Sequence, residues 1–342
     1  MSQNRGHPPR IIMRADARPD LGGGHITRCL ALADAARSCG ADVAFACNPG
    51  ASVVVPRLGD CGFPVLIARD RGELPVPPEW NERADAAVID LYDSTVEDEL
   101  SYRAIAGFVA AYEDLPERVH DCDLLIDQSL GASAAQYDGR IGNDTTLLLG
   151  PQYYAAREEF IAARPAALAR RQTPELRRIL ISMGLTDVRG ISWQVARVVL
   201  DAFPGEVEVI LGARAQSREA LETLSREYER LTLTIEARDI AQRMTRADLA
   251  IGAGGGTALE RCILGLPSLI LVLADNQLAL ANHLHDSGAA ERVSPNAPIE
   301  KTLPEALARM TPERLAEMSQ NAQSISDGEG AARLAEAILS RL

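Results

Sequence analysis

Short apolar runs alternate with stretches of helical periodicity along the whole chain. The run RIIMRA (10–15) precedes a glycine-rich loop, and in the next stretch, ITRCLALADAARSCG (26–40), apolar residues recur at helical spacing up to a glycine stop. This alternation predicts a parallel sheet with right-handed helical crossovers. A helix and a strand are expected within 101–115, and further strands at 42–47, 63–68, 84–92 and 122–129.

The alternation stops at a charged helical stretch, residues 157–178, and then restarts before ending in a helical, polar segment after residue 303. A chain of 342 residues is long enough for two domains. We therefore expect an α/β protein with two doubly wound domains, over residues 1–160 and 174–342. In the second domain, strands are expected at 178–184, 206–212, 231–237, 248–256 and 267–273, and helices at 191–203, 239–247 and 257–266.

Charge and composition narrow the classes of partner. The formal net charge of −13 argues against a nucleic-acid partner, because phosphate backbones are bound through clustered Lys and Arg. No stretch reaches the ~18 apolar residues of a membrane span, and the first ten residues lack the apolar core of a signal peptide. We expect a cytoplasmic monomer that contacts no membrane.

No metal or cofactor is expected. The six cysteines contain no C-x-x-C pair and lie mostly in apolar contexts, so we interpret them as reduced packing residues. His283 and His285 are two residues apart on a predicted helix, where their side chains point in different directions.

The segment DLAIGAGGGTALERCILGLP (248–267) places a glycine turn between a strand and a helix. Gly254, Gly255 and Gly256 let a ligand approach the backbone, whose N–H groups and helix dipole can bind a diphosphate. Thr257 can cap the helix with its hydroxyl, and Glu260 can accept hydrogen bonds from two ribose hydroxyls. Alternatively, the glycines only let the helix pack on the sheet and Glu260 is a solvated surface acid; spacing alone leaves both interpretations open.

This segment resembles the nucleotide-binding segment of GT-B sugar-nucleotide enzymes. The resemblance implies two Rossmann-like domains that face a central cleft, with the diphosphate at the glycine turn and the ribose at Glu260. It also implies that the uracil contacts backbone near Ala237, ahead of the segment DIAQRMTRADLAI.

The stretch from Arg14 to Cys47 resembles, more narrowly, the UDP-sugar hydrolases of the pseudaminic acid pathway and their relatives in surface-polysaccharide synthesis. The resemblance implies that water releases UDP from UDP-2,4-diacetamido-2,4,6-trideoxy-β-L-altropyranose by C–O cleavage with inversion, without a metal. At one position the chain departs from the family: SMGLTD has Leu185 where the family commonly has a second glycine, so this loop is expected to approach the ligand less closely. Four further segments match in order: VIDLYDS, HDCDLLIDQS, YYAAREEF and ADNQLALANHL.

His25 is the candidate general base of this hydrolysis. An imidazole, with an ordinary pKa of about 6.5, can accept a proton near neutral pH, and such a group contributes ~10²–10⁴-fold to a rate. Gly22, Gly23 and Gly24 would clear room for the sugar and let the ring face the water. His25 acts either as the base itself or by positioning the water; alternatively, it is an N-cap histidine. The resemblance gives His120 no role, and we expect it to be structural.

The resemblance supplies the remaining site residues. Tyr92 and Asn276 are polar partners that orient sugar, water or phosphate, or else a packing tyrosine and a turn asparagine. Arg14 and Asp16 contact the acetamido groups of the sugar or form a salt bridge with each other. Gln277 faces the diphosphate.

Three functions remain open. The first is the hydrolase. The second is a GT-B glycosyltransferase of surface or flagellar polysaccharide assembly, which would need a sugar or lipid acceptor; the first domain lacks a basic or aromatic-rich amphipathic patch for lipid docking. The third is a UDP-sugar sensor without turnover.

Overall fold

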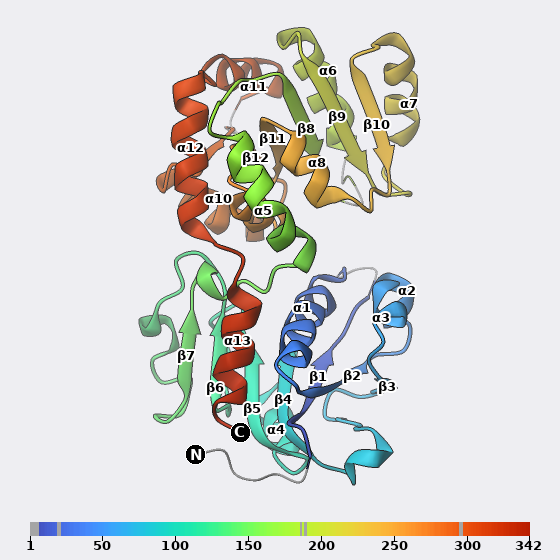
Figure 1. Cartoon of the computed structure of the whole chain (residues 1–342), viewed down its shortest axis with the longest axis vertical. Helices are drawn as coiled ribbons and strands as arrows, with labels where there is room; N and C mark the ends of the chain where they lie inside the picture. The colour runs from blue at the N-terminus through green and yellow to red at the C-terminus, as the bar shows by residue number, and fades with distance from the viewer. Residues whose placement is uncertain (1–6, 19–21, 185–186, 188–189, 294–296) are drawn as a thin grey trace. The chain divides into compact units, whose positions relative to one another are not determined.

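The computed structural model describes residues 7–18, 22–184, 187, 190–293 and 297–342. Contacts divide the chain into two compact units (Figure 1): unit 1 is Met1–Glu158 with Gly328–Leu342, and unit 2 is Glu159–Asp327. These units differ from the predicted ranges 1–160 and 174–342. Most of the predicted connection is helix α5 (Glu158–Arg170) and belongs to unit 2, whereas the last helix, α13 (Gly330–Leu339), belongs to unit 1.

Unit 1 is built on a seven-stranded sheet with the order β3-β2-β1-β4-β5-β6-β7, in which all pairs are parallel. The sequence predicts the first six strands, and the short strand β7 is an addition. The strands are β1 Arg10–Ala15, β2 Asp42–Cys47, β3 Val65–Ile67, β4 Ala84–Asp90, β5 Ala106–Tyr112, β6 Leu124–Asp127 and β7 Thr146–Leu149. The helices are α1 Gly24–Ser38, α2 Ala51–Val54, α3 Arg57–Asp60, α4 Val96–Tyr102 and α13, with 3₁₀ turns η1 Pro78–Trp80, η2 Ala134–Tyr137 and η3 Pro151–Tyr153.

Alternate residues of β1 face opposite sides of this sheet and enter two different cores. Ile11 and Met13 join the core that contains the apolar faces of α1 and α13, whereas Ile12 joins a core with Trp80 and Tyr102. Helices α1 and α13 contact each other, so the C-terminal helix completes the cover of one face (Figure 1). Burial on both sides explains why the strands are continuous apolar runs.

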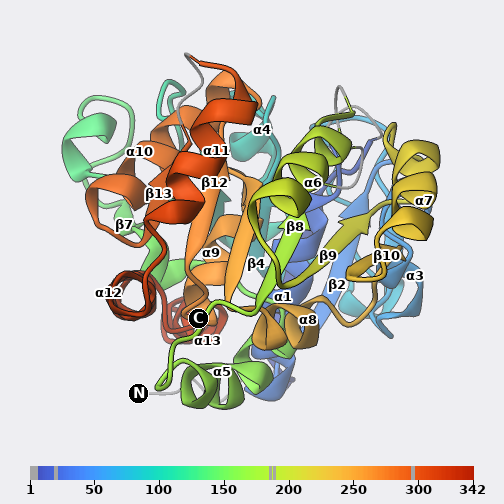
Figure 2. The same ribbon diagram turned by 90° about the horizontal axis from the view of Figure 1, so that it is seen from above.

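Unit 2 is built on a six-stranded parallel sheet with the order β10-β9-β8-β11-β12-β13. Helix α6 lies against β8 and β9, and α7 lies against β10 (Figure 2). The sequence predicts all the strands except β13. The strands are β8 Arg178–Ser182, β9 Glu206–Leu211, β10 Leu231–Ile235, β11 Leu249–Ala253, β12 Ser268–Leu271 and β13 Ala290–Arg292. The helices are α5, α6 Ile191–Ala202, α7 Arg218–Glu227, α8 Ile240–Arg246, α9 Thr257–Ile263, α10 Leu278–Asp286, α11 Ile299–Ala308 and α12 Pro312–Ile325, with the 3₁₀ turn η5 Asp275–Gln277.

In both sheets the chain starts in the middle, runs to one edge, and then returns to build the other half. The direction changes between β1 and β4 in unit 1 and between β8 and β11 in unit 2. At such a switch point, the loops after the two neighbouring strands lead to opposite faces of the sheet. Doubly wound domains bind their ligands in the crevice between these two loops. His25 follows β1, Tyr92 follows β4, and the glycine turn Gly254–Gly256 follows β11. The fold therefore brings the predicted segments to these two points.

Candidate active site

The centre of the unit 1 site is a hydrogen bond between His25 and Asp90. His25 lies in the first turn of α1, Asp90 ends β4, and both side chains are buried. His25 Nδ1 and Asp90 Oδ1 are in hydrogen-bond contact. A carboxylate accepts, so Nδ1 carries the proton and Nε2 presents its lone pair. Nε2 has no hydrogen-bond partner within the described residues, so the geometry leaves it available to accept a proton from a ligand or water.

Arg28 keeps Asp90, the hydrogen-bond partner of His25, in its ionised form. Its Nε and Nη2 donate to the two oxygens of Asp90, at 2.6 Å each, and its Nη1 donates to Asp114 at 2.8 Å. The guanidinium also lies over the ring of Tyr112, 4.6 Å from its centroid. Burial alone would raise the pKa of Asp90, but the charge and hydrogen bonds of Arg28, with that of His25, hold the pKa well below its usual range. Asp90 is therefore ionised and keeps His25 in one tautomer.

Asp90 and Arg28 are site residues that the sequence pattern does not predict. Asp90 stands in the matched segment VIDLYDS, and the signal that marks it is an aspartate directly at the end of a buried apolar strand. Such a carboxylate is costly unless it is paired. Arg28 carries no comparable signal, because its partner is 62 residues away.

Tyr92 forms one wall of the His25 ring. The two ring centroids are 4.2 Å apart with an interplanar angle of 76°, an edge-to-face contact. Tyr92 is 41% exposed and lies on the loop after β4. Burial raises its pKa above the usual value, so the hydroxyl remains protonated at neutral pH and can donate to a ligand.

Gly22 and Gly23, but not Gly24, are required by the local backbone and packing before His25. Gly22 has a φ of +78°, which few other residues adopt. Gly23 is the N-cap of α1, and a Cβ there would lie 2.4 Å from Cγ2 of Val55. A Cβ on Gly24 would meet nothing within 4 Å. The N-cap interpretation of His25 is therefore wrong, and only Gly24 lacks a reason within the packing of the chain.

Arg14 and Asp16 form the salt bridge that was one of the two interpretations of this pair; the other was contact with the acetamido groups of the sugar. Arg14 Nη1 lies 2.5 Å from Asp16 Oδ1, which also accepts a bond from the backbone N–H of Asn48 at 2.9 Å. Arg14 is buried, and its Nη2 lies 3.4 Å from the carbonyl of Asp70. The pair thus holds together the loops that follow β1, β2 and β3, and its contact with the sugar stays a prediction.

In unit 2 the glycine turn joins β11 to α9. The prediction that Thr257 caps the helix is wrong: Gly256 is the N-cap, Thr257 is the first helical residue, and no side-chain cap hydrogen bond is formed. A Cβ on Gly254 would lie 3.1 Å from the carbonyl oxygen of Gln277, whereas one on Gly255 would meet nothing within 4 Å. The backbone at Gly255 is therefore open to close approach by a ligand.

Glu260 and Arg261 lie on α9, just after this turn. Glu260 is 7% exposed, which is contrary to the interpretation as a solvated surface acid. Arg261 is also buried and donates to the carbonyl of Ala253 at 3.0 Å; Gly252 must lack a side chain because a Cβ would lie 2.3 Å from Nη1. Burial lowers the pKa of Arg261 to about 10. The sequence pattern does not predict this cation beside the glycine turn.

The other predicted residues fall near these elements. Gln277 accepts a hydrogen bond from the backbone N–H of Leu273 at 3.0 Å, so its side chain braces its own loop. Ala237 is half-buried, just after β10. Asn276 lies in η5, but its side chain is outside the described part of the structure, as is the whole of Leu185. The ligand contacts of all four stay predictions.

Metal-binding side chains and membrane-spanning helices both bear on possible partners. Within the described residues, no group of three or more His, Cys, Asp and Glu is placed to hold a metal ion. Across the same residues, every helix is too short or too polar to cross a bilayer.

Comparison with known proteins relates the chain to sugar-nucleotide enzymes. Residues 196–338 match the glycosyltransferase family 28 C-terminal domain. The chain is 25% identical over 284 residues to the UDP-2,4-diacetamido-2,4,6-trideoxy-beta-L-altropyranose hydrolase of Campylobacter jejuni, covering 82% of this chain and 97% of that protein. It is 24% identical over 279 residues to an uncharacterized protein of Methanocaldococcus jannaschii, covering 79% of this chain.

A third relative is a transferase. The UDP-N-acetylglucosamine–N-acetylmuramyl-(pentapeptide) pyrophosphoryl-undecaprenol N-acetylglucosamine transferase of Phenylobacterium zucineum is 34% identical over 173 residues, 47% of each chain. The match thus spans about half the length of this transferase, as it does for the archaeal protein, of which 56% is covered.

Solved structures establish the fold. MurG of Acinetobacter baumannii superposes with a TM-score of 0.69 at 17% identity, covering 97% of this chain and all of that one. At this identity the likeness shows the fold alone. The two Rossmann-like parallel-sheet domains are those of the GT-B fold, and residues 196–338 are similar to the C-terminal domain of glycosyltransferase family 28.

Proposed function

We propose that this protein is a hydrolase that releases UDP from UDP-2,4-diacetamido-2,4,6-trideoxy-β-L-altropyranose, in pseudaminic acid biosynthesis. One observation carries the proposal: the buried His25–Asp90 pair, with Nε2 of His25 unpartnered in the described residues. The relative from Campylobacter jejuni, which this chain covers almost completely, supports the substrate.

In this reaction His25 acts as the general base. Nε2 takes a proton from water as the water oxygen attacks the anomeric carbon, and Asp90 stabilises the imidazolium that forms. The bond from the anomeric carbon to the diphosphate oxygen breaks, and its electron pair leaves with UDP. A single displacement inverts the configuration. The proton on His25 then passes to solvent, and Tyr92 offers its hydroxyl to orient sugar or water.

Unit 2 binds the nucleotide in this proposal. The backbone N–H groups of Gly254–Gly256 bind the diphosphate, and Glu260 binds the ribose hydroxyls. The buried guanidinium of Arg261, 3.0 Å from the carbonyl of Ala253, adds positive charge beside the departing UDP. The uracil contacts backbone near Ala237.

The experiment supplies this UDP-sugar to the purified protein without an acceptor and measures UDP. The expected result is release of UDP with inversion, and in ¹⁸O-labelled water the label enters the sugar and not the UDP. Release that depends on an acceptor, or label in the UDP, contradicts the proposal. A panel of diacetamido UDP-sugars then tests the identity of the sugar.

The second candidate function is a GT-B glycosyltransferase that uses a UDP-sugar for surface or flagellar polysaccharide. The family 28 match and the 34% identical transferase favour it. This enzyme would release UDP only when a sugar or lipid hydroxyl is supplied. The third alternative, a sensor without turnover, would bind the UDP-sugar and release no UDP from it.

A further inference from the structure

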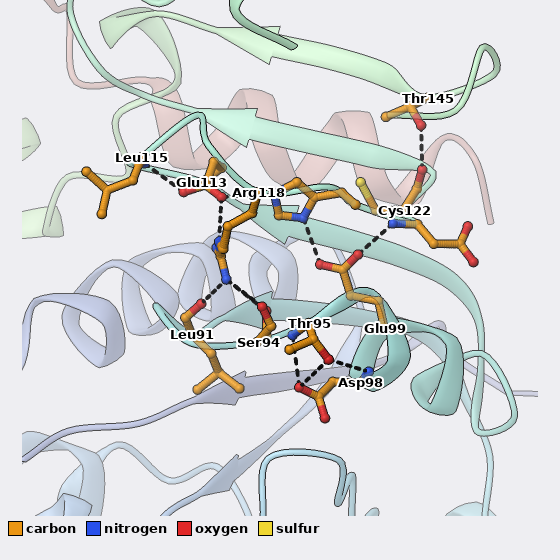
Figure 3. A network of polar contacts seen from close by, with 12 residues as sticks. Leu91, Ser94, Thr95, Asp98, Glu99, Glu113, Leu115, Arg118, Cys122 and Thr145 are labelled. Carbon is orange, nitrogen blue, oxygen red and sulfur yellow. Dashed lines mark hydrogen bonds and ion pairs between the residues drawn. The ribbon is translucent and has the colours of Figure 1, made fainter. Parts of the chain in front are cut away.

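Unit 1 contains a second buried charge cluster that the proposed reaction does not use. It consists of Glu99, Glu113, Arg118 and His120, and we call it the Arg118 cluster. Both glutamates and His120 are buried, with side chains about 1% exposed. Figure 3 shows Arg118 between Glu113 and the chain around Leu91 and Ser94. The cluster therefore reaches the loop that carries Tyr92.

Arg118 holds both ends of this loop. Its Nη1 donates to the carbonyl of Leu91 at 3.0 Å and to the carbonyl of Ser94 at 2.9 Å, with the hydroxyl of Ser94 at 3.2 Å (Figure 3). One nitrogen thus contacts the residues on either side of Tyr92 and Asp93. A lysine has no planar group that can contact these carbonyls and Glu113 together.

Glu113 holds Arg118 in turn. Its Oε2 accepts from Arg118 Nε at 2.7 Å and from His120 Nε2 at 2.9 Å, and its Oε1 accepts from the backbone N–H of Leu115 at 2.7 Å. His120 Nδ1 lies 2.8 Å from Glu99 Oε1, and Glu99 belongs to α4, the helix that begins after the Tyr92 loop. The cluster therefore ties this loop to α4 and to the end of β5.

The chain neighbour of Glu113 supports the other half of the site. Asp114 accepts from Arg28, which in turn binds Asp90, the partner of His25. Two consecutive carboxylates after β5 thus brace the His25 ring through one arginine and the Tyr92 loop through another. Tyr92 itself has no side-chain hydrogen bond within the described residues and touches His25 only with its ring, so its backbone determines where it lies.

We infer that Arg118 is a positioning residue, which acts through Tyr92 by holding the loop Leu91–Ser94 so that the tyrosine lies edge-on to His25. The inference rests on the proposed function, because it assigns Tyr92 a part in that reaction. Without Arg118, the carbonyls of Leu91 and Ser94 lose a charged donor. Arg71 still donates to the carbonyl of Asp93 between them, so the loop keeps its middle contact but not the bonds that hold its two ends.

The kinetic test is a double-mutant cycle on UDP release. Arg118→Gln is expected to lower kcat about tenfold and to change KM less than about twofold, because orientation and not binding is lost. In a Tyr92→Leu background the same change is expected to lower kcat less than about twofold. Equal losses in the two backgrounds overturn the inference.

The matched control is Arg103→Gln. Arg103 pairs with Asp121 and Asp123 in the same β5–β6 connection but makes no hydrogen bond to the Tyr92 loop. The Arg103→Gln variant is expected to retain the kcat of the wild type. Arg118→Lys keeps the charge beside Glu113 and perturbs folding less. Its kcat is expected to lie between that of Arg118→Gln and that of the wild type. A loss in Arg103→Gln equal to that in Arg118→Gln contradicts the inference.

A second readout is independent of turnover. The ring current of Tyr92 shifts the C–H resonances of His25 in NMR spectra of histidine-labelled protein, and Tyr92→Leu defines the size of this shift. Arg118→Gln is expected to remove more than half of the shift, and Arg103→Gln to retain it. If the wild type releases no UDP, the proposed function fails, while this measurement still decides the inference: an unchanged His25 shift in Arg118→Gln overturns it.

Discussion

The two switch points of this molecule present different chemistry on the same strand order. In unit 1, buried side chains form a charge network: His25, Asp90, Arg28 and Asp114 are linked by hydrogen bonds. In unit 2, the corresponding place is a turn of glycines, with a Cβ excluded at Gly252 and open backbone at Gly255.

This difference indicates separate roles for the two switch points, proton transfer in unit 1 and ligand binding in unit 2. A buried network with an available imidazole nitrogen can move a proton, whereas the glycine turn offers backbone N–H groups that bind an anion but no group that can take a proton. We therefore expect substitutions at the unit 1 switch point to change kcat and those at the unit 2 switch point to change KM. The predictions below test this separation, starting with the largest expected effect.

Replacement of His25 by alanine removes the proposed base. We expect kcat for UDP release to fall about 10³-fold, within the usual range for a general base. Binding of UDP, measured by calorimetry, is expected to stay within about twofold, because the proposed nucleotide contacts are in unit 2. An equal loss of UDP affinity and of kcat would contradict the assignment of proton transfer to unit 1 and of nucleotide binding to unit 2.

Asp90→Asn keeps the shape of the carboxylate but not its charge. We expect kcat to fall about 10²-fold, because the tautomer and the imidazolium of His25 lose their support. Arg28 then loses one of its two carboxylate partners and keeps Asp114, so stability is expected to fall as well, and the variant is compared with wild type below its melting temperature. A kcat within threefold of wild type would show that the pair is only structural.

Gly255→Ala tests the unit 2 turn by adding one methyl group. The methyl group meets no protein atom within 4 Å, so folding is expected to be unaffected. We expect KM to rise about tenfold with kcat nearly unchanged, as for the loss of one or two hydrogen bonds to the diphosphate. The control is Gly59→Ala in α3, where a Cβ is equally free. Unchanged KM in Gly255→Ala would exclude close approach of the ligand at this turn.

The last prediction concerns stability and not activity: His120 is expected to make the free energy of unfolding depend on pH. Burial alone would lower its pKa, but hydrogen bonds and charges of Glu113 and Glu99 raise the pKa to about 9. Because this value exceeds the unfolded value of about 6.5, the stabilisation is complete below pH ~6.5, declines up to about pH 9, and is lost above it.

Urea unfolding between pH 6 and 9.5 measures this effect. The difference in unfolding free energy between wild type and His120→Gln is expected to shrink as the pH rises, by at most about 1.4 kcal/mol per pH unit. A constant difference for His120→Gln would show that the imidazole does not change charge in this window.

Most of the fold is predictable from local pattern. Eleven of the strands coincide with predicted apolar runs, because strands buried on both faces are continuously apolar. The strands β7 and β13 were missed because they are short and lie at sheet edges. The return of α13 to unit 1 was also missed, since its apolar face is typical of any amphipathic helix and does not show which core it joins.

The candidate site was predictable only in part. His25, Tyr92 and the glycine turn stand in recognisable segments, whereas the roles of Arg28 and Arg118 depend on Asp90 and Leu91, which are 62 and 27 residues away. The partner of Arg261 is Ala253, eight residues before it, but the burial of Arg261 has no signal in the sequence. An arginine that donates to a carboxylate or carbonyl far along the chain looks, in sequence, like any surface arginine. The cap predicted at Thr257 failed for a local reason, because the helix begins one residue too early for its hydroxyl.

The position of the last helix has a practical consequence. Because Leu334 and Ile338 pack in the core that contains Ile11 and Met13, unit 1 is made of two separate pieces of the chain. A fragment that stops after residue 158 would expose this apolar surface to water and is expected to aggregate. An excised unit 1 therefore needs its C-terminal segment joined back by a short linker, whereas unit 2 is one uninterrupted insertion within it.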